Sequence, residues 1–523
     1  MPENKFFETE VVITGGGITG TGLARDLALR GIGCIVLEQE NINAGASGRN
    51  HGLLHSGARY VLSDPESARE CKKQSDILKK IAPQCIEKTG GLYVAVKGDD
   101  ENYIDRFAQL CTKAGILCEQ LSPAMALELE PCLSKDIIAA FRVEDASVDP
   151  FHLSLENMNQ AIEHNARYFN LCRVVKFVRS KGRITKVVAQ DLLHKRFFEI
   201  RADVVVNAAG AWAGRVAGLA GVRVDMVYSK GTLLITHNRI ADHVINRLRP
   251  PDDGDILVPG GTVSIFGTTS VHLDSPDVIR PSIKETDLLV DQAKAMVPEL
   301  EHARFIRAYA GIRPLALTRK SEDLDNDRAV SRGFTLFDHE SDGIENFITI
   351  TGGKLTTFRL MAEKAGDLAA EKLNCKARST TAQTPLKSDS PSRMTEAGIS
   401  FKLWAGQGRK SDTTLCECEM IFKTQFEQLI SWLKKNRKKA DLNALRIHSR
   451  LGKGACQGTF CSQRVTGLMY DENYLKADEG ILNIKDLLNE RFAGQRTVLW
   501  DGQLVQSQLC ELVYCGFYGL DLQ

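Results

Sequence analysis

The hydrophobic and polar positions near the start of the chain follow the pattern of a strand, a helix and a second strand. An apolar run predicts a buried strand from Glu10 to Thr14, and apolar residues at helical spacing predict a helix that continues to Arg30. A second apolar run predicts a buried strand from Cys34 to Leu37. This order is typical of a parallel α/β unit.

Farther along, β-rich and helical segments mix without a detectable internal repeat up to about residue 375. Two strand-like runs, 203–206 and 347–350, each lead into a glycine-containing turn. Residues 379–392 are polar and contain two prolines, which is the composition of a linker or surface loop. We therefore predict one α/β unit over 1–376, a linker over 377–410 and a separate C-terminal part.

Composition narrows the class of protein. At about 150 residues per domain, 523 residues allow two to four domains. The 43% hydrophobic and 25% charged residues exclude a disordered or fibrous chain. The net charge of +1 gives no overall field that would attract nucleic acid. No apolar run is long enough to span a membrane, the N-terminus lacks a signal-peptide pattern, and we expect the fourteen cysteines to be mainly reduced thiols in an intracellular protein.

The turn after the first predicted strand carries a glycine motif. Gly15, Gly17 and Gly20 fit G-x-G-x-x-G, in which small residues allow the backbone to approach a pyrophosphate and a helix N-terminus to face it. Glu38, 18 residues after Gly20, ends the second strand, where a carboxylate can accept hydrogen bonds from a ribose. The context favours a dinucleotide site over an ordinary glycine-rich turn, although these glycines do not distinguish FAD from NAD.

Four further segments carry a resemblance to a known family: SGRNHGLLHSGARY (47–60), NAAGAWA (207–213), AGIRPL (310–315) and ITGGKLTTFR (350–359). With the glycine motif, they make residues 8–375 resemble the FAD-dependent glycerol-3-phosphate dehydrogenases of the D-amino-acid-oxidase-like superfamily. With the C-terminal cysteines, the chain is most similar to the A subunits of the anaerobic enzymes. The resemblance implies a Rossmann-type FAD-binding domain interleaved with a β-sheet substrate domain, followed by a small, mainly helical iron-sulfur domain.

The resemblance also implies a set of FAD-binding residues. Residues 173–176 resemble the strand whose backbone holds the adenine ring, although an ordinary strand fits them almost as well. The run 351–357 opens a predicted helix whose N–H groups could face the reduced flavin, whereas the alternative is a capped helix start without a ligand. The predicted cofactor residues are Gly15, Gly17, Gly20, Glu38, Ser47, Gly48, Arg49, Leu54, Val174, Gly210, Gly352, Gly353, Lys354, Leu355 and Thr356.

A second set of residues is implied on the substrate side. His55 matches the catalytic base of the family, with His51 as a rival and simple hydrogen bonding to the flavin as an alternative role. A phosphate dianion needs fixed cations, and Arg donates hydrogen bonds in pairs. The phosphate-binding candidates are Arg59, Tyr60, Arg313 and Lys354, of which Arg313 is also expected to be catalytic. Lys230 matches a family position but is interpreted as structural.

The C-terminal part contains four closely paired cysteines. Cys416 and Cys418 form C-x-C, and Cys456 and Cys461 form C-x4-C after 37 intervening residues. Two thiolate pairs fit either a [2Fe-2S] cluster or zinc, and C-x-C favours the cluster. Free buried thiols are the third interpretation. The pattern resembles the bacterioferritin-associated-ferredoxin-like domain, which we expect over 411–465, with a tail over 466–523 that packs on the rest or on a partner.

The implied function is oxidation of sn-glycerol 3-phosphate to dihydroxyacetone phosphate, with hydride transfer to flavin N5. Electrons would then pass through the cluster to a companion flavoprotein subunit, an iron-sulfur membrane-anchor subunit and quinone. The chain would be cytoplasmic and held peripherally at the inner membrane by these subunits. The alternatives are an amino-acid or opine oxidoreductase and a non-catalytic electron-transfer scaffold. A basic run that includes Lys434, Arg446 and Arg450 predicts a solvated helix face, with docking on a partner or on anionic lipid as alternatives, and nucleic acid is not expected.

Overall fold

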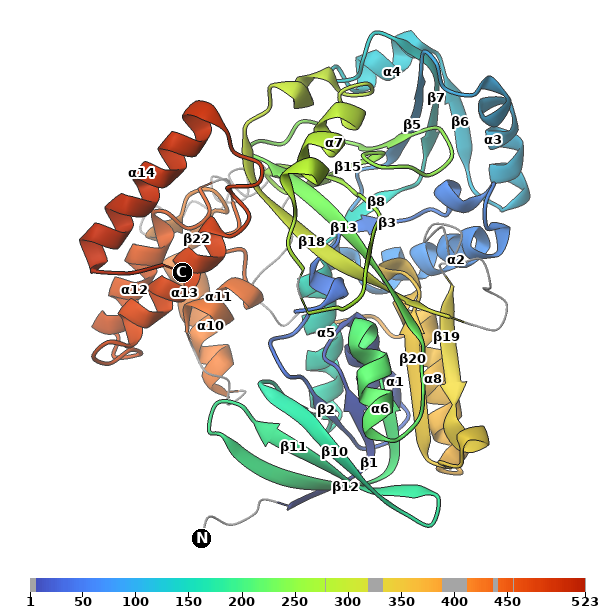
Figure 1. The fold of residues 1–523 in the computed structure, drawn as a ribbon, viewed down its shortest axis with the longest axis vertical. Coiled ribbons are helices and arrows are strands. Elements are labelled where there is room, and N and C mark those ends of the chain that lie inside the picture. Colours follow the sequence, from blue (N-terminus) through green and yellow to red (C-terminus); the bar gives the residue numbers. More distant parts are fainter. Residues whose placement is uncertain are drawn as a thin grey trace.

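The computed structural model describes residues 6–277, 279–317, 333–387, 412–435, 441–454 and 456–522. Two large sheets form the body of the molecule, one below the other in Figure 1, and the C-terminal helices lie along one flank. The α/β class, the interleaved domains and the mainly helical C-terminal region are confirmed. None of the described helices is both long enough and apolar enough to cross a membrane.

The lower sheet is the predicted dinucleotide-binding sheet. It has the order β10-β11-β12-β1-β2-β9, and β20 pairs with β12 and β19. The strands are β1 (Phe6–Thr14), β2 (Cys34–Leu37), β9 (Arg167–Phe169), β10 (Cys172–Ser180), β11 (Arg183–Asp191), β12 (Arg196–Asn207), β19 (Phe334–Asp338) and β20 (Phe347–Gly352). The predicted runs at 10–14, 34–37, 203–206 and 347–350 all lie in these strands.

Helices cover both faces of this sheet, which explains why its central strands are continuously apolar. Val11 and Ile13 pack with α1 (Ile18–Leu29), α5 (Pro150–Glu163) and α8 (Phe358–Lys372). Val12 points to the opposite face, where α6 (Ala213–Leu219) and β10 to β12 form a second core. The carboxyl ends of β1 and β2 therefore open at an edge where a ligand can bind.

The upper sheet has the order β17-β13-β16-β15-β14-β5-β7-β6, and β18 pairs with β13. Its strands are β5 (Gly91–Val96), β6 (Cys118–Leu121), β7 (Ile137–Val143), β13 (Met226–Thr236), β14 (Val244–Arg247), β15 (Ile256–Gly260), β16 (Val263–Gly267), β17 (Val271–Leu273) and β18 (Phe305–Ala316). The small sheet β3-β8-β4 (Leu53–Leu54, Ala146–Val148, Ile86–Glu87) lies beside it. The associated helices are α2 (Pro65–Ile81), α3 (Glu101–Lys113), α4 (Pro123–Leu129) and α7 (Ile283–Ala293). The chain alternates between the two sheets, so the domains are interleaved.

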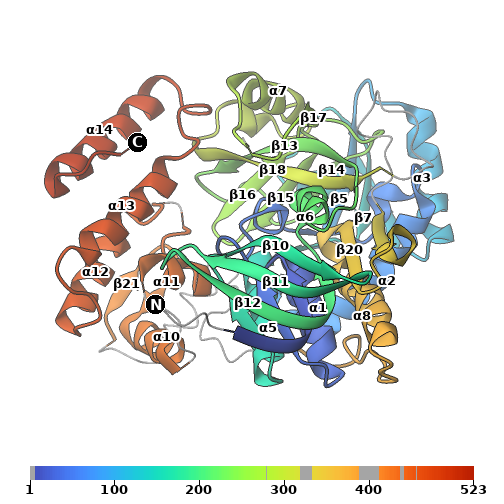
Figure 2. The same ribbon diagram turned by 60° about the horizontal axis from the view of Figure 1, so that its bottom comes forward.

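The C-terminal region contains one hydrophobic core. Its elements are β21 (Thr414–Cys416), β22 (Ile421–Phe422), α10 (Lys423–Lys435), α11 (Leu442–His448), α12 (Cys461–Asp471), α13 (Glu479–Phe492) and α14 (Asp501–Tyr518). Figure 2 shows these helices gathered at one side, away from α3. Because α12 runs through residue 465, the predicted boundary between cluster domain and tail falls inside a helix.

The predicted linker is described only in its first part. Arg25 of α1 donates to the carbonyls of Thr381 and Thr384, and the N–H of Leu386 donates to Ile81. Residues 377–387 thus run along the α/β unit and pack on it. The rest of the predicted linker, 388–410, lies outside the described residues.

Candidate active site

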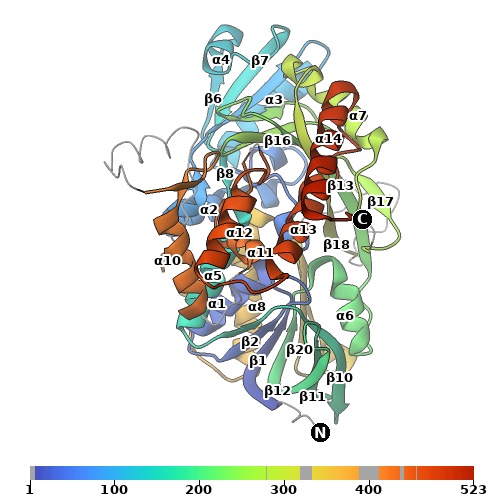
Figure 3. The same ribbon diagram turned by 90° about the vertical axis from the view of Figure 1, so that its left-hand side faces the viewer.

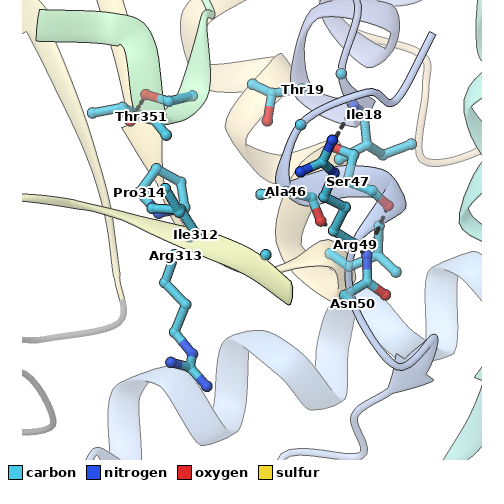
Figure 4. A pocket seen from close by; sticks show the side chains of 18 of the residues that line it. Ile18, Thr19, Ala46, Ser47, Arg49, Asn50, Ile312, Arg313, Pro314 and Thr351 are labelled. Carbon is cyan, nitrogen blue, oxygen red and sulfur yellow. Dashed lines mark hydrogen bonds between the residues drawn. The ribbon is translucent and has the colours of Figure 1, made fainter. Parts of the chain in front are cut away.

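A cavity of about 610 Å³ lies where the carboxyl ends of β1 and β2 meet the underside of the upper sheet. Its walls come from segments far apart in the sequence. Figure 4 shows Ala46, Ser47, Arg49 and Asn50 on one wall and β18 with Arg313 on the facing wall. The cavity extends from Glu38 and Val174 at one end to His55 and Lys354 at the other.

The glycine motif brings backbone close to backbone at the start of this cavity. Gly15 has φ +113°, and a Cβ there would lie 2.5 Å from the Ala208 carbonyl oxygen. A Cβ on Gly20 would lie 1.9 Å from the carbonyl oxygen of Gly15. The first turn of α1 has no acidic residue, so its N–H groups and dipole are suited to an anion.

Glu38 closes one end of the cavity. Its carboxylate accepts a hydrogen bond of 2.7 Å from the Gly16 N–H, and burial raises the pKa of this carboxyl group. Nearby, the buried hydroxyl of Thr14 has no hydrogen-bond partner among the described residues. Val174 in β10 lines the same end. An acceptor, an unsatisfied hydroxyl and a strand backbone here fit the adenosine half of a dinucleotide.

Arg59 lies on the substrate side as one half of a buried ion pair. Its Nη2 is 3.1 Å from Asp255 Oδ2, and Asp255 also receives Arg249 Nε at 2.8 Å. Burial is the largest single influence and would lower the pKa of Arg59, but the charge and hydrogen bond of Asp255, together with Tyr93 and Tyr60, outweigh it and raise the pKa. Asp255 therefore holds two guanidinium groups, one of which, that of Arg59, lines the cavity.

Arg313 on β18 donates several hydrogen bonds to the upper sheet. Its Nη1 donates to Ser229 Oγ at 3.1 Å, and its Nη2 donates to the Thr269 carbonyl at 2.9 Å and to the Thr268 hydroxyl. These three bonds orient the guanidinium on β18. Lys230, by contrast, is buried and donates to Glu285 at 2.8 Å, in agreement with a structural role.

Lys354, Tyr60 and His55 lie together at the same end. Lys354 Nζ donates to Ser67 Oγ at 2.9 Å and lies 4.7 Å from the centre of the Tyr60 ring. The rings of His55 and Tyr60 are 5.3 Å apart, and the His55 N–H donates to Thr356 Oγ1 at 3.1 Å. His51 also lines the cavity, with its ring 6.2 Å from that of His55. The structure thus places an imidazole and a phenol side by side, with one cationic side chain over the phenol ring.

The predicted residues divide into those that line the cavity and those that support its wall. The lining residues are His55, Arg59, Tyr60, Arg313, Lys354, Gly15, Gly17, Glu38, Ser47, Arg49, Val174, Gly210, Gly352, Gly353 and Leu355. Gly20, Gly48, Leu54 and Thr356 lie behind them. Gly20 packs on Gly15, Gly48 packs on Phe151, and Thr356 anchors the His55 backbone.

Three polar residues that the sequence did not indicate help to build the site. Asp255 holds Arg59, Ser229 holds Arg313 and Ser67 holds Lys354. They lie 196, 84 and 287 residues from their partners. No local pattern marks them, because each contact depends on the tertiary fold.

The four predicted metal ligands meet as two thiol pairs. Cys416 hydrogen-bonds with Cys461, and Cys418 with Cys456. Backbone N–H groups of Gly458, Thr459 and Phe460 also point to the Cys456 sulfur. Within the part of the chain that the structure describes, no three His, Cys, Asp or Glu side chains stand at metal-binding geometry. The thiols are therefore gathered as two pairs.

The basic run between the cysteines is not a single solvated face. Arg450 lies between Glu419 and Asp149 with its side chain only 14% exposed, and burial lowers the pKa of Arg446. Lys434 lies 3.9 Å from the centre of the Tyr474 ring. The residues at 437–439 lie outside the described part.

Solved structures with this fold include flavin enzymes. Glycerol-3-phosphate dehydrogenase from Bacillus halodurans, complexed with FAD, has a TM-score of 0.64 at 20% identity and covers 94% of this chain and 96% of its own. L-proline dehydrogenase from P. horikoshii has a TM-score of 0.58 at 21% identity and covers 72% of this chain and 96% of its own. These likenesses confirm the fold.

Sequence relatives are closer. The A subunit of the anaerobic glycerol-3-phosphate dehydrogenase from Escherichia coli K12 is 40% identical over 98% of this chain and 97% of its own length. The protein of the same name from Haemophilus influenzae is 39% identical over 98% of this chain and 94% of its own length. The model of the FAD dependent oxidoreductase family (DAO) matches residues 10–367. The chain therefore belongs to the FAD-dependent oxidoreductase family, together with the A subunits of anaerobic glycerol-3-phosphate dehydrogenase.

Proposed function

We propose that this chain oxidises sn-glycerol 3-phosphate to dihydroxyacetone phosphate, as the names of its relatives indicate for those proteins. The single observation that supports this most is that Arg59, Arg313 and Lys354 line the same cavity. A phosphate dianion needs more than one cation, whereas a carboxylate substrate can be held by one arginine. The cation set therefore favours a phosphorylated alcohol over an amino acid or opine.

FAD is the cofactor that the cavity would hold. Gly15, Gly17 and the first turn of α1 would face the pyrophosphate, and Glu38 would accept hydrogen bonds from the ribose. Val174 would lie at the adenine, while Gly352, Gly353 and Leu355 would lie toward the isoalloxazine. When bound, the flavin accepts a hydride and releases electrons singly. The protein's part is to hold the alcohol carbon near the flavin and to remove the hydroxyl proton.

We assign proton removal to the His55 imidazole. Its backbone is fixed by Thr356, and its ring lies beside Tyr60 at the cationic end of the cavity. Arg59, Arg313 and Lys354 would hold the phosphate so that the secondary hydroxyl faces this ring, and Tyr60 would add its hydroxyl. Arg313 would also stabilise the oxygen as its proton leaves.

The test is anaerobic bleaching of the bound flavin. Glycerol 3-phosphate should bleach it, whereas glycine, proline and opines should not. His55→Ala should keep FAD but lose bleaching by substrate, and His51→Ala serves as the matched control. An undiminished rate in His55→Ala, or loss only in His51→Ala, would remove His55 from the mechanism. No bleaching by any alcohol or amine would favour the electron-transfer scaffold.

The cysteine pairs support a [2Fe-2S] cluster at Cys416, Cys418, Cys456 and Cys461. The donor set is four thiols, and hydrogen bonds from backbone N–H groups stabilise sulfur ligands and tune cluster potential. A one-electron centre beside FAD would provide an onward route for electrons. Reduction with dithionite should give a [2Fe-2S] EPR signal, and zinc without iron in anaerobically prepared protein would contradict the cluster.

The electrons would leave toward companion subunits, since the relatives are named as A subunits. Helix α14 offers a surface for such a partner. Val505, Leu509, Leu512, Val513 and Phe517 follow helical spacing, and each side chain is at least 59% exposed. Figure 3 shows α14 along the outer flank of the molecule, and its Tyr514 hydroxyl donates to the Thr459 carbonyl in the Cys456–Cys461 loop.

The charges of α14 favour a protein partner over a lipid surface. The helix contains Asp501 and Glu511 but neither Lys nor Arg, whereas helices that bind anionic membranes are basic. Peripheral attachment to the membrane, and delivery to quinone, would then come through the partner subunits. Leu509→Asp should abolish co-purification with them and leave FAD and iron in place. Leu482→Asp on α13, where the leucine is also exposed, is the control, and equal loss in both variants would exclude a specific α14 interface.

A further inference from the structure

A buried ion network joins the sulfur-bearing region to the α/β unit. At its centre is Arg450, which lies between α11 and Cys456 in the sequence. Its Nε donates to Glu419 Oε2, and its Nη1 is 3.5 Å from Asp149 Oδ2. The three side chains are only 14%, 1% and 11% exposed, respectively. One guanidinium thus bridges carboxylates from two parts of the molecule.

The Asp149 end of the network leads to the cavity wall. Asp149 caps α5 by accepting the first amides of the helix at 2.9 and 3.0 Å. Asn43 donates to the Pro150 carbonyl at 2.7 Å, and a Cβ on Gly48 would lie 2.7 Å from the Phe151 ring. Since Gly48 lies between the lining residues at 47 and 49, the start of α5 directly supports the loop 43–49.

The Glu419 end leads to the sulfur site. Glu419 follows Cys418 in the chain, and its backbone N–H is directed to the Cys416 sulfur. A Cβ on Gly454 would lie 2.4 Å from the Cβ of Cys418, so the loop carrying Arg450 is closely packed on the cysteines. The adjacent Lys453 lies over the Phe151 ring at 5.2 Å. Contacts from this loop therefore reach both the thiols and the support of the cavity.

We propose that Arg450 is a positioning residue that fixes the sulfur site against the cofactor-lining loop 43–49, so that electron exchange between the two centres depends on it. The inference deepens the proposed function and rests on it only for the presence of the two centres. A planar guanidinium can bind two carboxylates at once, whereas a lysine would act as a single point charge. Electron transfer between protein-bound centres slows steeply with distance, so a small change in docking alters the rate.

A second set of contacts holds the C-terminal region on the α/β unit and does not depend on Arg450. The Ala308 N–H donates to the Gly494 carbonyl at 3.1 Å, and Arg307 Nη1 donates to the Glu490 carbonyl at 2.6 Å. These bonds join the end of α13 to β18 and do not involve the network. An Arg450 variant should therefore stay attached, with a loosened position of the cysteine loop.

The experiment uses the full chain with FAD and iron, and reduces the flavin by light in the presence of EDTA without substrate. Electron arrival at the iron centre is followed by absorbance and by freeze-quench EPR. Removing one partner of a buried ion pair strongly weakens the contact, so Arg450→Met should slow transfer by roughly tenfold at unchanged FAD and iron content. Because substrate is not used, a wrong assignment of the substrate would not affect this result.

Two further variants separate positioning from folding. Asp149→Asn keeps the helix cap, because Asn is also a good N-cap, and removes only the charge that faces Arg450. It should show the same defect, and the double variant should be no slower than Arg450→Met alone. Arg464→Met is the matched control, since Arg464 pairs with Glu417 beside the cysteines but on the exposed side. It should leave transfer unchanged.

Amide hydrogen exchange gives a readout that requires no electron transfer. In Arg450→Met and Asp149→Asn, exchange should rise at 43–49 and at 449–454, but not in Arg464→Met. Unchanged exchange and unchanged transfer in both variants would overturn the proposal. Faster exchange over the whole chain would also overturn it, because it would indicate general destabilisation.

Discussion

The cofactor cavity and the cysteine site are built to different degrees by the protein alone. In the cavity, backbone packing at Gly15 and Gly20 and fixed partners for Arg59 and Arg313 set the geometry. At the cysteines, the four sulfurs pair with one another, and no three side chains in the described ranges form a metal-binding group. The cavity is shaped by backbone packing, whereas the sulfur site brings its four thiols together as two pairs.

The difference follows from what each ligand demands. A long dinucleotide is recognised by many weak contacts along a preformed crevice, so the protein has to fix the backbone beforehand. A metal centre supplies strong bonds itself, and its binding free energy organises the ligands. We therefore expect changes to the backbone to damage the cofactor cavity most. The cysteine site should be damaged most by the loss of a cysteine that binds the metal centre.

The largest effect is expected from adding a methyl group at Gly20. The Cβ would lie 1.9 Å from the Gly15 carbonyl oxygen, so Gly20→Ala has to displace the turn. We expect loss of bound FAD and a free energy of unfolding lower by about 3 kcal/mol, the upper end for overpacking. Flavin absorbance per protein and urea unfolding measure this.

Gly218→Ala in α6 is the control, because apart from the neighbouring backbone of its own helix no described atom lies within 4 Å of the added Cβ. It should keep FAD and change stability by less than about 1 kcal/mol. Full FAD occupancy in Gly20→Ala would show that the turn is less preorganised than its packing indicates.

The next largest effect is expected when one of the four cysteines of the sulfur site is replaced. Cys456→Ser removes the sulfur that receives three backbone N–H groups. It should lose the iron-sulfur absorbance and EPR signal and lower the melting temperature of the C-terminal region, while FAD content and substrate bleaching stay normal. Cys515→Ser on α14 should keep the iron. Loss of FAD in Cys456→Ser would contradict the independence of the two regions.

A smaller effect is expected where a single side chain of the cavity is shortened. Arg313→Met removes the fork held by Ser229 and Thr269, and should raise the KM for glycerol 3-phosphate by roughly thirtyfold, equivalent to about 2 kcal/mol. Ser229→Ala removes one orienting bond and should cost about 1 kcal/mol, a change of roughly fivefold. Steady-state kinetics under anaerobic conditions test both, and a larger effect for Ser229→Ala would show that Arg313 does not contact the substrate.

The features that could be predicted from the sequence are those determined by the spacing of neighbouring residues. The strand, glycine turn and helix at 10–30 and the C-x-C and C-x4-C pairs could be recognised because each motif is short and carries its own chemistry. The family resemblance then supplied His55, Arg59, Arg313 and Lys354, which line one cavity.

What could not be predicted depends on contacts between distant segments. Asp255 is an acidic residue at the end of the turn before β15, and only the fold places it against Arg59. Arg450 belongs to a basic run that predicts a solvated face, yet it is buried because Asp149 and Glu419 meet there. Burial and pairing of charges come from tertiary structure, and a single sequence gives no local signal for them.

The smallest effect is expected from removing the charge of a single carboxylate. Two carboxylates can be compared: the exposed Asp277 beside the cavity, and Asp149, which lies in the ion network with Arg450. The pKa of Asp277 is lowered to about 2 by hydrogen bonds from Arg215 and Ser275. Burial by itself would raise the pKa of Asp149, but Lys453 and Arg450 outweigh burial and lower it to about 2. Both values lie below the ordinary 3.8, so each stabilising contribution is present above about pH 4 and is lost as the pH falls toward 2.

Although the two pKa values are equal, the two carboxylates should contribute differently to the free energy of unfolding, because solvent screens the exposed one. Since Asp277 is exposed, Asp277→Asn should scarcely change the free energy of unfolding near pH 7. Asp149→Asn should lower it measurably, because it leaves Arg450 with a single carboxylate in a buried site. Each difference from the unmodified protein should shrink as urea unfolding is repeated from about pH 7 down to about pH 3. A larger loss of unfolding free energy in Asp277→Asn than in Asp149→Asn would contradict this expectation, because it would show that the exposed ion pair stabilises the protein more than the buried network does.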